Sequence, residues 1–112
     1  MSSDGMLELV ACRLRVLGDP VRLRILGLLQ VREATVSELA DELSTSAPAV
    51  CKHLARLHQA GIVARRRDGM SVRYAVADYT AFRLVEQAGA GVAAYAEELA
   101  ETAGLALAAA QQ

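Results

Sequence analysis

The chain has 112 residues, of which 54% are hydrophobic and 4% aromatic, with 12 Lys and Arg against 13 Asp and Glu. This length favours one compact domain over residues 1–112, and a partner subunit would enlarge its core. Because no apolar run approaches the roughly 18 residues of a membrane span, and residues 1–5 are polar rather than signal-like, a soluble cytoplasmic protein is expected.

The charges are segregated along the chain. Residues 44–76 carry six basic side chains and one acidic, whereas residues 1–43 carry five basic and seven acidic and residues 77–112 carry one basic and five acidic. A basic middle between acidic ends predicts an anionic partner for the middle segment.

The first two predicted helices lie within residues 6–31. Apolar residues recur at three- and four-residue steps from Met6 to Leu17, which predicts an amphipathic helix over residues 6–17. Gly18 interrupts this pattern. The pair Asp19-Pro20 then supplies an N-cap acceptor and a proline at the first helical position, so a second helix is expected over about residues 20–31.

Two further helices follow, separated by a tight turn. Thr35 and Glu38 have the T-x-x-E spacing of a capping box, which predicts a short helix over about residues 36–43. Residues 44–46 form a turn, and Ser46 caps a fourth helix that starts at Ala47-Pro48 and is expected to face inward with Val50, Leu54 and Leu57. Gly61 is expected to end that helix as a left-handed residue.

The remainder of the chain predicts a β-hairpin and a long helix. Residues 62–67 and 71–77 have the pattern of extended strands, with Asp68-Gly69 as the turn between them. Asp78 caps a last helix over about residues 79–107. Gly and Ala dominate its middle, where another helix could approach closely.

The element order, α-α-α-α-β-β-α, is that of a winged helix-turn-helix, a mainly α fold with a β-hairpin wing. The helix-turn-helix is expected over about residues 36–60, and the wing over about residues 62–77. The second helix of such a pair enters the major groove of DNA. Small, polar and basic side chains on its leading edge and on the wing are therefore predicted to contact DNA: Thr45, Ser46, Ala47, Ala49, Cys51, Lys52, His53, Arg56, Arg65, Arg66, Arg67 and Arg73.

Three segments resemble the ArsR/SmtB family of bacterial repressors. These are L-G-D-P-V-R-L-R-I-L-G-L-L from Leu17 to Leu29, S-A-P-A-V-C-K-H-L-A-R-L-H-Q-A-G-I-V from Ser46 to Val63, and R-D-G-M-S-V-R-Y-A-V from Arg67 to Val76. The resemblance implies a homodimer that packs through its first and last helices, residues of about 6–17 and 79–107. It also implies a palindromic DNA operator, from which an effector releases the repressor.

Members of the family that this sequence resembles bind metals at two sites, and this sequence departs from the ligand pattern of both. The family's cysteine pair near the third helix falls on Thr35 and Ser37. In the last-helix site Asp78 matches, but the other ligand positions hold Thr80, Gly91 and Ala94, so Asp78 is better explained as an N-cap. A divalent metal at an unrecognised site stays possible, for example one shared between chains.

The remaining soft or imidazole ligands are Cys12, Cys51, His53 and His58. No pair of them has the i,i+3 or i,i+4 spacing of a metal site on one helix, and there is no CxxC spacing. Cys51 lies near Lys52 and Arg56, so it is either a redox-sensitive thiol or a small residue in place of the family's serine. A disulfide between Cys12 and Cys51 has only weak support from the pattern.

Two other function classes fit the sequence less well. The chain has no nucleophile with a base in a recognisable motif, so catalysis is not expected. A winged helix that binds protein rather than DNA is the alternative, and the basic middle segment argues against it. The effector is left open between a metal, a redox signal, a small organic ligand and none.

Overall fold

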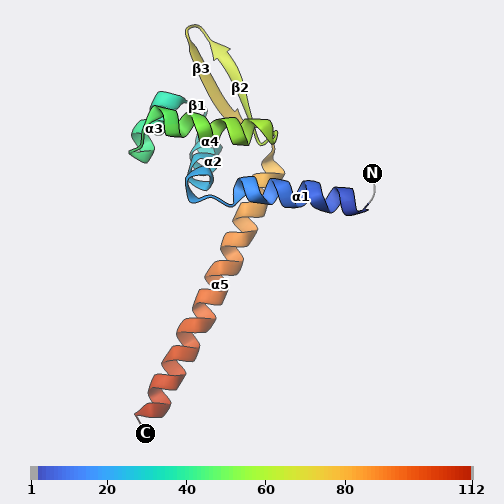
Figure 1. Cartoon of the computed structure of the whole chain (residues 1–112). Helices are drawn as coiled ribbons and strands as arrows, with labels where there is room; N and C mark the ends of the chain where they lie inside the picture. The colour runs from blue at the N-terminus through green and yellow to red at the C-terminus, as the bar shows by residue number, and fades with distance from the viewer. Residues whose placement is uncertain (1–2, 112) are drawn as a thin grey trace. The chain divides into compact units, whose positions relative to one another are not determined.

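The computed structural model describes residues 3–111 and confirms the mainly helical class with a hairpin wing (Figure 1). The elements are α1 (Ser3–Leu17), α2 (Pro20–Val31), β1 (Ala34–Thr35), α3 (Val36–Leu43), α4 (Ala47–Gln59), β2 (Val63–Asp68), β3 (Ser71–Val76) and α5 (Tyr79–Ala110). Residues up to Phe82 form one compact unit. A second unit begins at Arg83 and consists of the rest of α5.

Local capping sets most of the helix ends. The Asp19 carboxylate accepts hydrogen bonds from the backbone N–H groups of Val21 and Arg22, and Pro20 follows it, so α2 begins where predicted. α1 begins three residues before the predicted start, with Asp4 in its first turn facing the positive end of the helix. α5 runs three residues beyond the predicted end because Ala108 to Ala110 are strong helix formers.

The core of the first unit lies between α2, α3, α4 and the base of the hairpin. The inward face predicted for α4 is confirmed, because Val50, Leu54 and Leu57 are fully buried. Further apolar side chains are buried in α2, in α3 and at the base of the hairpin: Ile25, Leu26, Leu29, Leu39, Ile62 and Val63. Removing these surfaces from water is the main force that holds α4 against the domain.

The sheet has three antiparallel strands in the order β1-β3-β2, one more than the sequence predicted. β1 pairs Ala34 with Tyr74 and Thr35 with Arg73. A strand of two residues has no alternation to recognise, and it exists only because β3 lies beside it. β1 ties the wing to the start of α3.

The hairpin turn lies one residue later than predicted. Asp68 pairs with Ser71, so Gly69 and Met70 form the two-residue loop rather than Asp68 and Gly69. Gly69 has a φ of +63°, and a two-residue loop with glycine first matches the twist of the strands on either side. Gly61, at the end of α4, has the predicted left-handed conformation with a φ of +73°.

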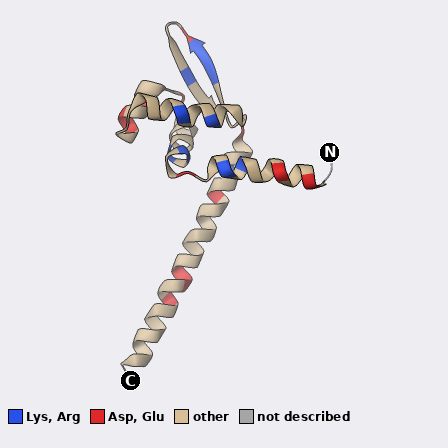
Figure 2. Ribbon diagram, viewed as in Figure 1, with Lys and Arg blue, Asp and Glu red and all other residues tan. Residues whose placement is uncertain are grey.

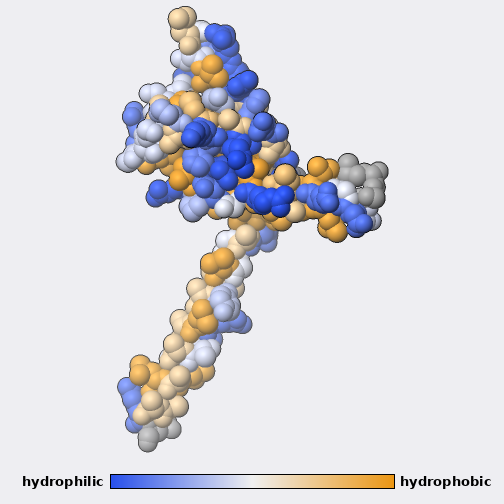
Figure 3. Space-filling view, in the orientation of Figure 1, coloured by the Kyte–Doolittle hydropathy of each residue, from blue (hydrophilic) through white to orange (hydrophobic). Residues whose placement is uncertain are grey.

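Two helices expose large apolar side chains in the single chain. On α1, the apolar residues Met6, Leu7, Val10 and Leu14 are exposed, and Val16 and Leu17 at its end are buried. On α5, exposed apolar residues continue through the second unit: Leu84, Val92, Tyr95, Leu99, Leu105 and Leu107 (Figure 3). None of the helices of residues 3–111 is long and apolar enough to cross a membrane.

Candidate nucleic-acid interface

The turn between α3 and α4 is closed by its own backbone. Ser44 ends α3 in the left-handed conformation with a φ of 51°, and the N–H of Thr45 returns to the carbonyl of Ala40 at 3.0 Å. Ser46 then caps α4, because its hydroxyl accepts a hydrogen bond from the N–H of Ala49 at 3.3 Å. The two helices are therefore joined by three residues, the tight connection of a helix-turn-helix.

α4 and the turn before it carry most of the predicted DNA contacts. Thr45 and Ser46, in the turn before α4, are exposed, as are Ala47, Cys51, Lys52 and Arg56 on the helix itself. Ala49 and His53 are half-buried. Lys52 and Arg56 are one helical turn apart and make no side-chain hydrogen bond or ion pair within the described residues. Their charges are thus free to meet an external anion. Figure 2 shows the basic positions of α4 as blue bands on the ribbon.

His53 differs from its neighbours because it has a partner inside the domain. Its Nδ1 lies 3.2 Å from Nη1 of Arg22 and 3.9 Å from the Asp19 carboxylate. The imidazole is therefore turned toward α2. Its predicted DNA contact stays a prediction.

The wing divides its four arginines between its two faces. Arg66 lies opposite Arg73 in the strand register, so both are on one face, and the alternation of a strand puts Arg65 and Arg67 on the other. Arg66 pairs with Glu33. Arg65 and Arg67 have no such partner among residues 3–111, which leaves two unpaired cations on one face of β2.

Arg73 links the wing to the helix-turn-helix. Its guanidinium donates to the carboxylates of Glu38 at 3.3 Å and Asp68 at 3.0 Å. Glu38 also accepts from the N–H of Thr35 at 3.1 Å, in the capping box that starts α3. Arg73 thus holds the hairpin in place. To contact DNA as well, its guanidinium would have to divide its hydrogen bonds between a phosphate and these two carboxylates.

Met70 is a wing residue that sequence reasoning did not select. It is fully exposed at the tip of the hairpin, between Gly69 and Ser71. An apolar side chain on a basic wing is suited to the wall of a DNA groove. The only signal in the sequence was the position of Met70 next to the predicted turn. Because that turn was placed at Asp68-Gly69, one residue too early, Met70 was not recognised as the tip of the hairpin.

Two capping carboxylates make the stability of the domain sensitive to acid. Hydrogen bonds from the backbone, of Arg22 to Asp19 and of Thr35 to Glu38, hold the pKa of each carboxyl below its ordinary value. A carboxyl with a lowered pKa in the folded state stabilises the fold above its unfolded pKa, about 4, and this stabilisation is lost as the pH falls through the folded pKa.

We therefore expect the free energy of unfolding to drop below about pH 4, and the drop to be smaller in Asp19→Asn and Glu38→Gln. Thermal unfolding at fixed protein concentration from pH 7 to pH 3 measures it. Asp41→Asn is the matched control, since the Asp41 side chain makes no hydrogen bond in the described part of the chain. The same acid sensitivity in all three variants would contradict this assignment.

The described residues hold no group of three or more His, Cys, Asp or Glu side chains that could bind a metal ion. At the start of α5, Asp78 accepts hydrogen bonds from Thr80 and Arg13, and the Thr80 hydroxyl is the main cause that lowers the Asp78 pKa. This confirms a capping contact for Asp78. Cys12 and Cys51 are both exposed free thiols.

The family model described as "Bacterial regulatory protein, arsR family" matches residues 19–65. The HTH-type transcriptional regulator KmtR of Mycobacterium tuberculosis is 36% identical over 96 residues, which are 80% of this chain and 74% of that protein. KmtR is therefore a relative that matches this chain over most of its own length.

Two solved structures support the same fold. The crystal structure of M. tuberculosis Rv0081 matches with a TM-score of 0.76 and 31% identity, over 83% of this chain and 94% of that one. The homodimeric winged helix-turn-helix DNA-binding domain of Mb0332 from Mycobacterium bovis, a possible ArsR-family transcriptional regulator, matches with a TM-score of 0.73 and 26% identity. That match covers 82% of this chain and 87% of that one.

Proposed function

Because the chain belongs to the arsR family of bacterial regulatory proteins, we propose that it is a transcriptional repressor that binds operator DNA as a homodimer. This is a family of regulators rather than of enzymes. The observation that carries the proposal is a set of cations on the helix-turn-helix and its wing that have no partner within residues 3–111: Lys52, Arg56, Arg65 and Arg67.

α4 is the recognition helix in this proposal. The exposed side chains of its N-cap and first two turns, including Ser46, Ala47 and Cys51, are small enough to let the helix enter the major groove and face base edges. Lys52 and Arg56 meet the phosphates on either side. These contacts divide into base reading at the start of α4 and charge neutralisation further along it.

The wing contacts the adjacent backbone in the same proposal. Arg65 and Arg67 supply the charge, and Met70 at the tip supplies an apolar contact. Arg66 and Arg73 contribute less, because Glu33, Glu38 and Asp68 already offset their charges. This ranks the four wing arginines, which the sequence pattern could not do.

The homodimer is proposed to form through α1 and α5. Both helices expose apolar side chains that the single chain leaves in water, including Leu7 at 65% and Val92 at 69% exposure. An amphipathic helix with no core to cover is stabilised by a second copy. The structural relative from M. bovis is itself described as homodimeric.

A two-fold dimer presents its two recognition helices to half-sites about 10 base pairs apart, so the operator is expected to be a palindrome. Nuclease footprinting on the DNA upstream of the protein's own gene is expected to protect two such half-sites. Transcription from that promoter in vitro is expected to fall as the protein is added. Protection without any fall in transcription would retain the DNA binding and overturn the repressor assignment.

The class of effector is tested on the DNA-bound protein. The DNA-bound protein is titrated with divalent metals, and separately with an oxidant and with a reductant. The additive that releases the DNA distinguishes a metal effector from a redox effector. If Cys51 is a redox switch, an oxidant releases the DNA and Cys51→Ser abolishes that release while it leaves the affinity in reductant unchanged. Release by oxidant that survives Cys51→Ser would exclude this thiol.

A further inference from the structure

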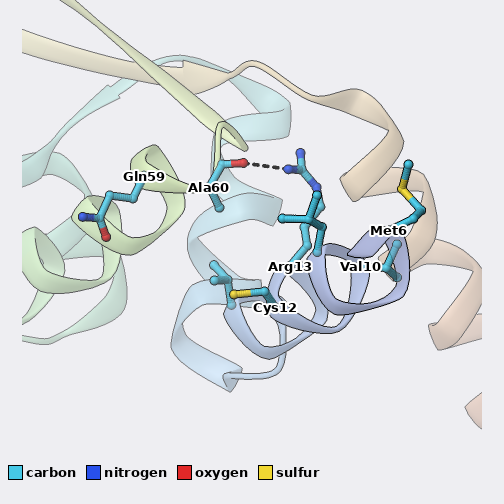
Figure 4. Close-up of a pocket in the computed structure, with 8 residues that line it drawn as sticks. Met6, Val10, Cys12, Arg13, Gln59 and Ala60 are labelled. Atoms are coloured by element: carbon cyan, nitrogen blue, oxygen red, sulfur yellow. Dashed lines mark hydrogen bonds between the residues drawn. The ribbon is translucent and has the colours of Figure 1, made fainter. Parts of the chain in front are cut away.

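Arg13 connects three elements at the end of the recognition helix. Its Nη1 donates to the carbonyl of Ala60 at 2.7 Å (Figure 4). Its Nη2 donates to the carboxylate of Asp78. Ala60 is the C-cap residue of α4, and Asp78 immediately precedes α5. One guanidinium from α1 therefore holds both the last turn of α4 and the first turn of α5.

Arg22 makes a corresponding connection nearer the start of α4. Its Nε donates to the carbonyl of Val16 at 2.5 Å, in the last turn of α1, where carbonyls have no partner within the helix. Its Nη1 lies 3.2 Å from Nδ1 of His53 on α4. Arg22 belongs to α2, so this side chain joins α1, α2 and α4.

The two arginines thus contact α4 at His53 and at Ala60, about two helical turns apart. The apolar face of Val50, Leu54 and Leu57 fixes how deeply α4 is buried, but burial is not directional. Hydrogen bonds have a preferred direction, so two of them at separated points fix the tilt of the helix and its rotation about its axis.

We propose that Arg13 and Arg22, together called the arginine clamp, are positioning residues that fix the orientation of the recognition helix relative to α1. This inference rests on the proposed function, in which α1 lies at the dimer interface. The clamp then sets the distance and angle between the two recognition helices of a dimer. It also gives His53 a role as an anchor point of α4 rather than as a base contact.

The test uses Arg13→Gln and Arg22→Gln in the full-length protein. Arg15→Gln is the matched control, because Arg15 lies on α1, loses the same charge, and has an exposed side chain with no hydrogen bond or ion pair within residues 3–111. Each protein is titrated onto operators whose half-sites have the natural spacing or one or two base pairs more or less, and onto a single half-site.

The clamp variants are expected to lose about tenfold in affinity at the natural spacing, the scale of one charged hydrogen bond, and to depend less on spacing than the wild type. Their affinity for a single half-site is expected to equal that of Arg15→Gln. Dimerisation, measured by sedimentation, is expected to be unchanged. Arg13→Lys, which keeps a cation beside Asp78, is expected to recover part of the spacing dependence.

Other outcomes would overturn the inference. An equal loss on every duplex, the half-site included, would make these arginines phosphate contacts rather than positioning residues. An unchanged spacing profile in both variants would show that apolar packing alone orients α4. If both glutamine variants fail to fold, the deciding measurement is the spacing profile of Arg13→Lys. A profile identical to that of the wild type would then count against the clamp. A wild-type protein without preference for any duplex would instead refute the proposed function itself.

Discussion

Leu99→Glu is expected to convert the dimer to a monomer and to lower the affinity for the full operator by about a hundredfold. Val92, Tyr95 and Leu99 follow one another at three- and four-residue steps, which puts them on one face of α5, and each is more than half exposed. The second unit is a single helix and has no core of its own. A charge on this face would be buried without a partner at the proposed interface.

Ala90→Glu is the control, because the helical period puts Ala90 on the opposite side of α5 from Tyr95. It introduces the same charge into the same helix and is expected to leave the dimer intact. Sedimentation equilibrium gives the mass of each variant, and anisotropy on the operator gives its affinity. A Leu99→Glu protein that remains dimeric with wild-type affinity would remove α5 from the proposed interface.

The double variant Arg65→Gln, Arg67→Gln is expected to show the second large effect. Each cation that meets a phosphate contributes about 0.9 to the slope of log affinity against log salt, so the slope is expected to become shallower by about two for each wing bound. Affinity at moderate salt is expected to fall by about a hundredfold for a dimer. The loss is expected to be similar on operator and random DNA, because phosphates carry no sequence information.

Arg66→Gln is the matched control on the same strand. The pairing with Glu33 raises the Arg66 pKa and already offsets its charge, so its removal is expected to change the slope less than removal of Arg65 or Arg67 alone. Anisotropy titrations from low to high salt measure the slopes of the wild type, of Arg66→Gln and of the double variant. Equal slopes for the control and the double variant would contradict the ranking of the wing arginines.

The sequence predicted features that are decided within a few residues. The cap of α2 at Asp19, the capping box of Thr35 and Glu38, and the left-handed Gly61 all depend on neighbours along the chain. The inward face of α4 followed from the helical period. These local signals were enough for the fold class and for the order of every element except β1.

The partners of the predicted site residues could not be read in this way. His53 meets Arg22, Arg66 meets Glu33, and Arg73 meets Glu38, each across more than thirty residues. A basic pattern does not show which charges the fold itself neutralises, and β1 is too short to be recognised without β3. Separating the free cations from the paired ones therefore required the tertiary structure.

The most direct test is a fluorescence anisotropy titration of the full-length protein onto duplex DNA from upstream of its own gene, against a scrambled duplex, over a range of salt. The account predicts submicromolar binding that prefers the natural sequence and weakens steeply as salt rises. Binding with no preference for any duplex, and without salt dependence, would contradict it and would favour a winged helix that binds protein.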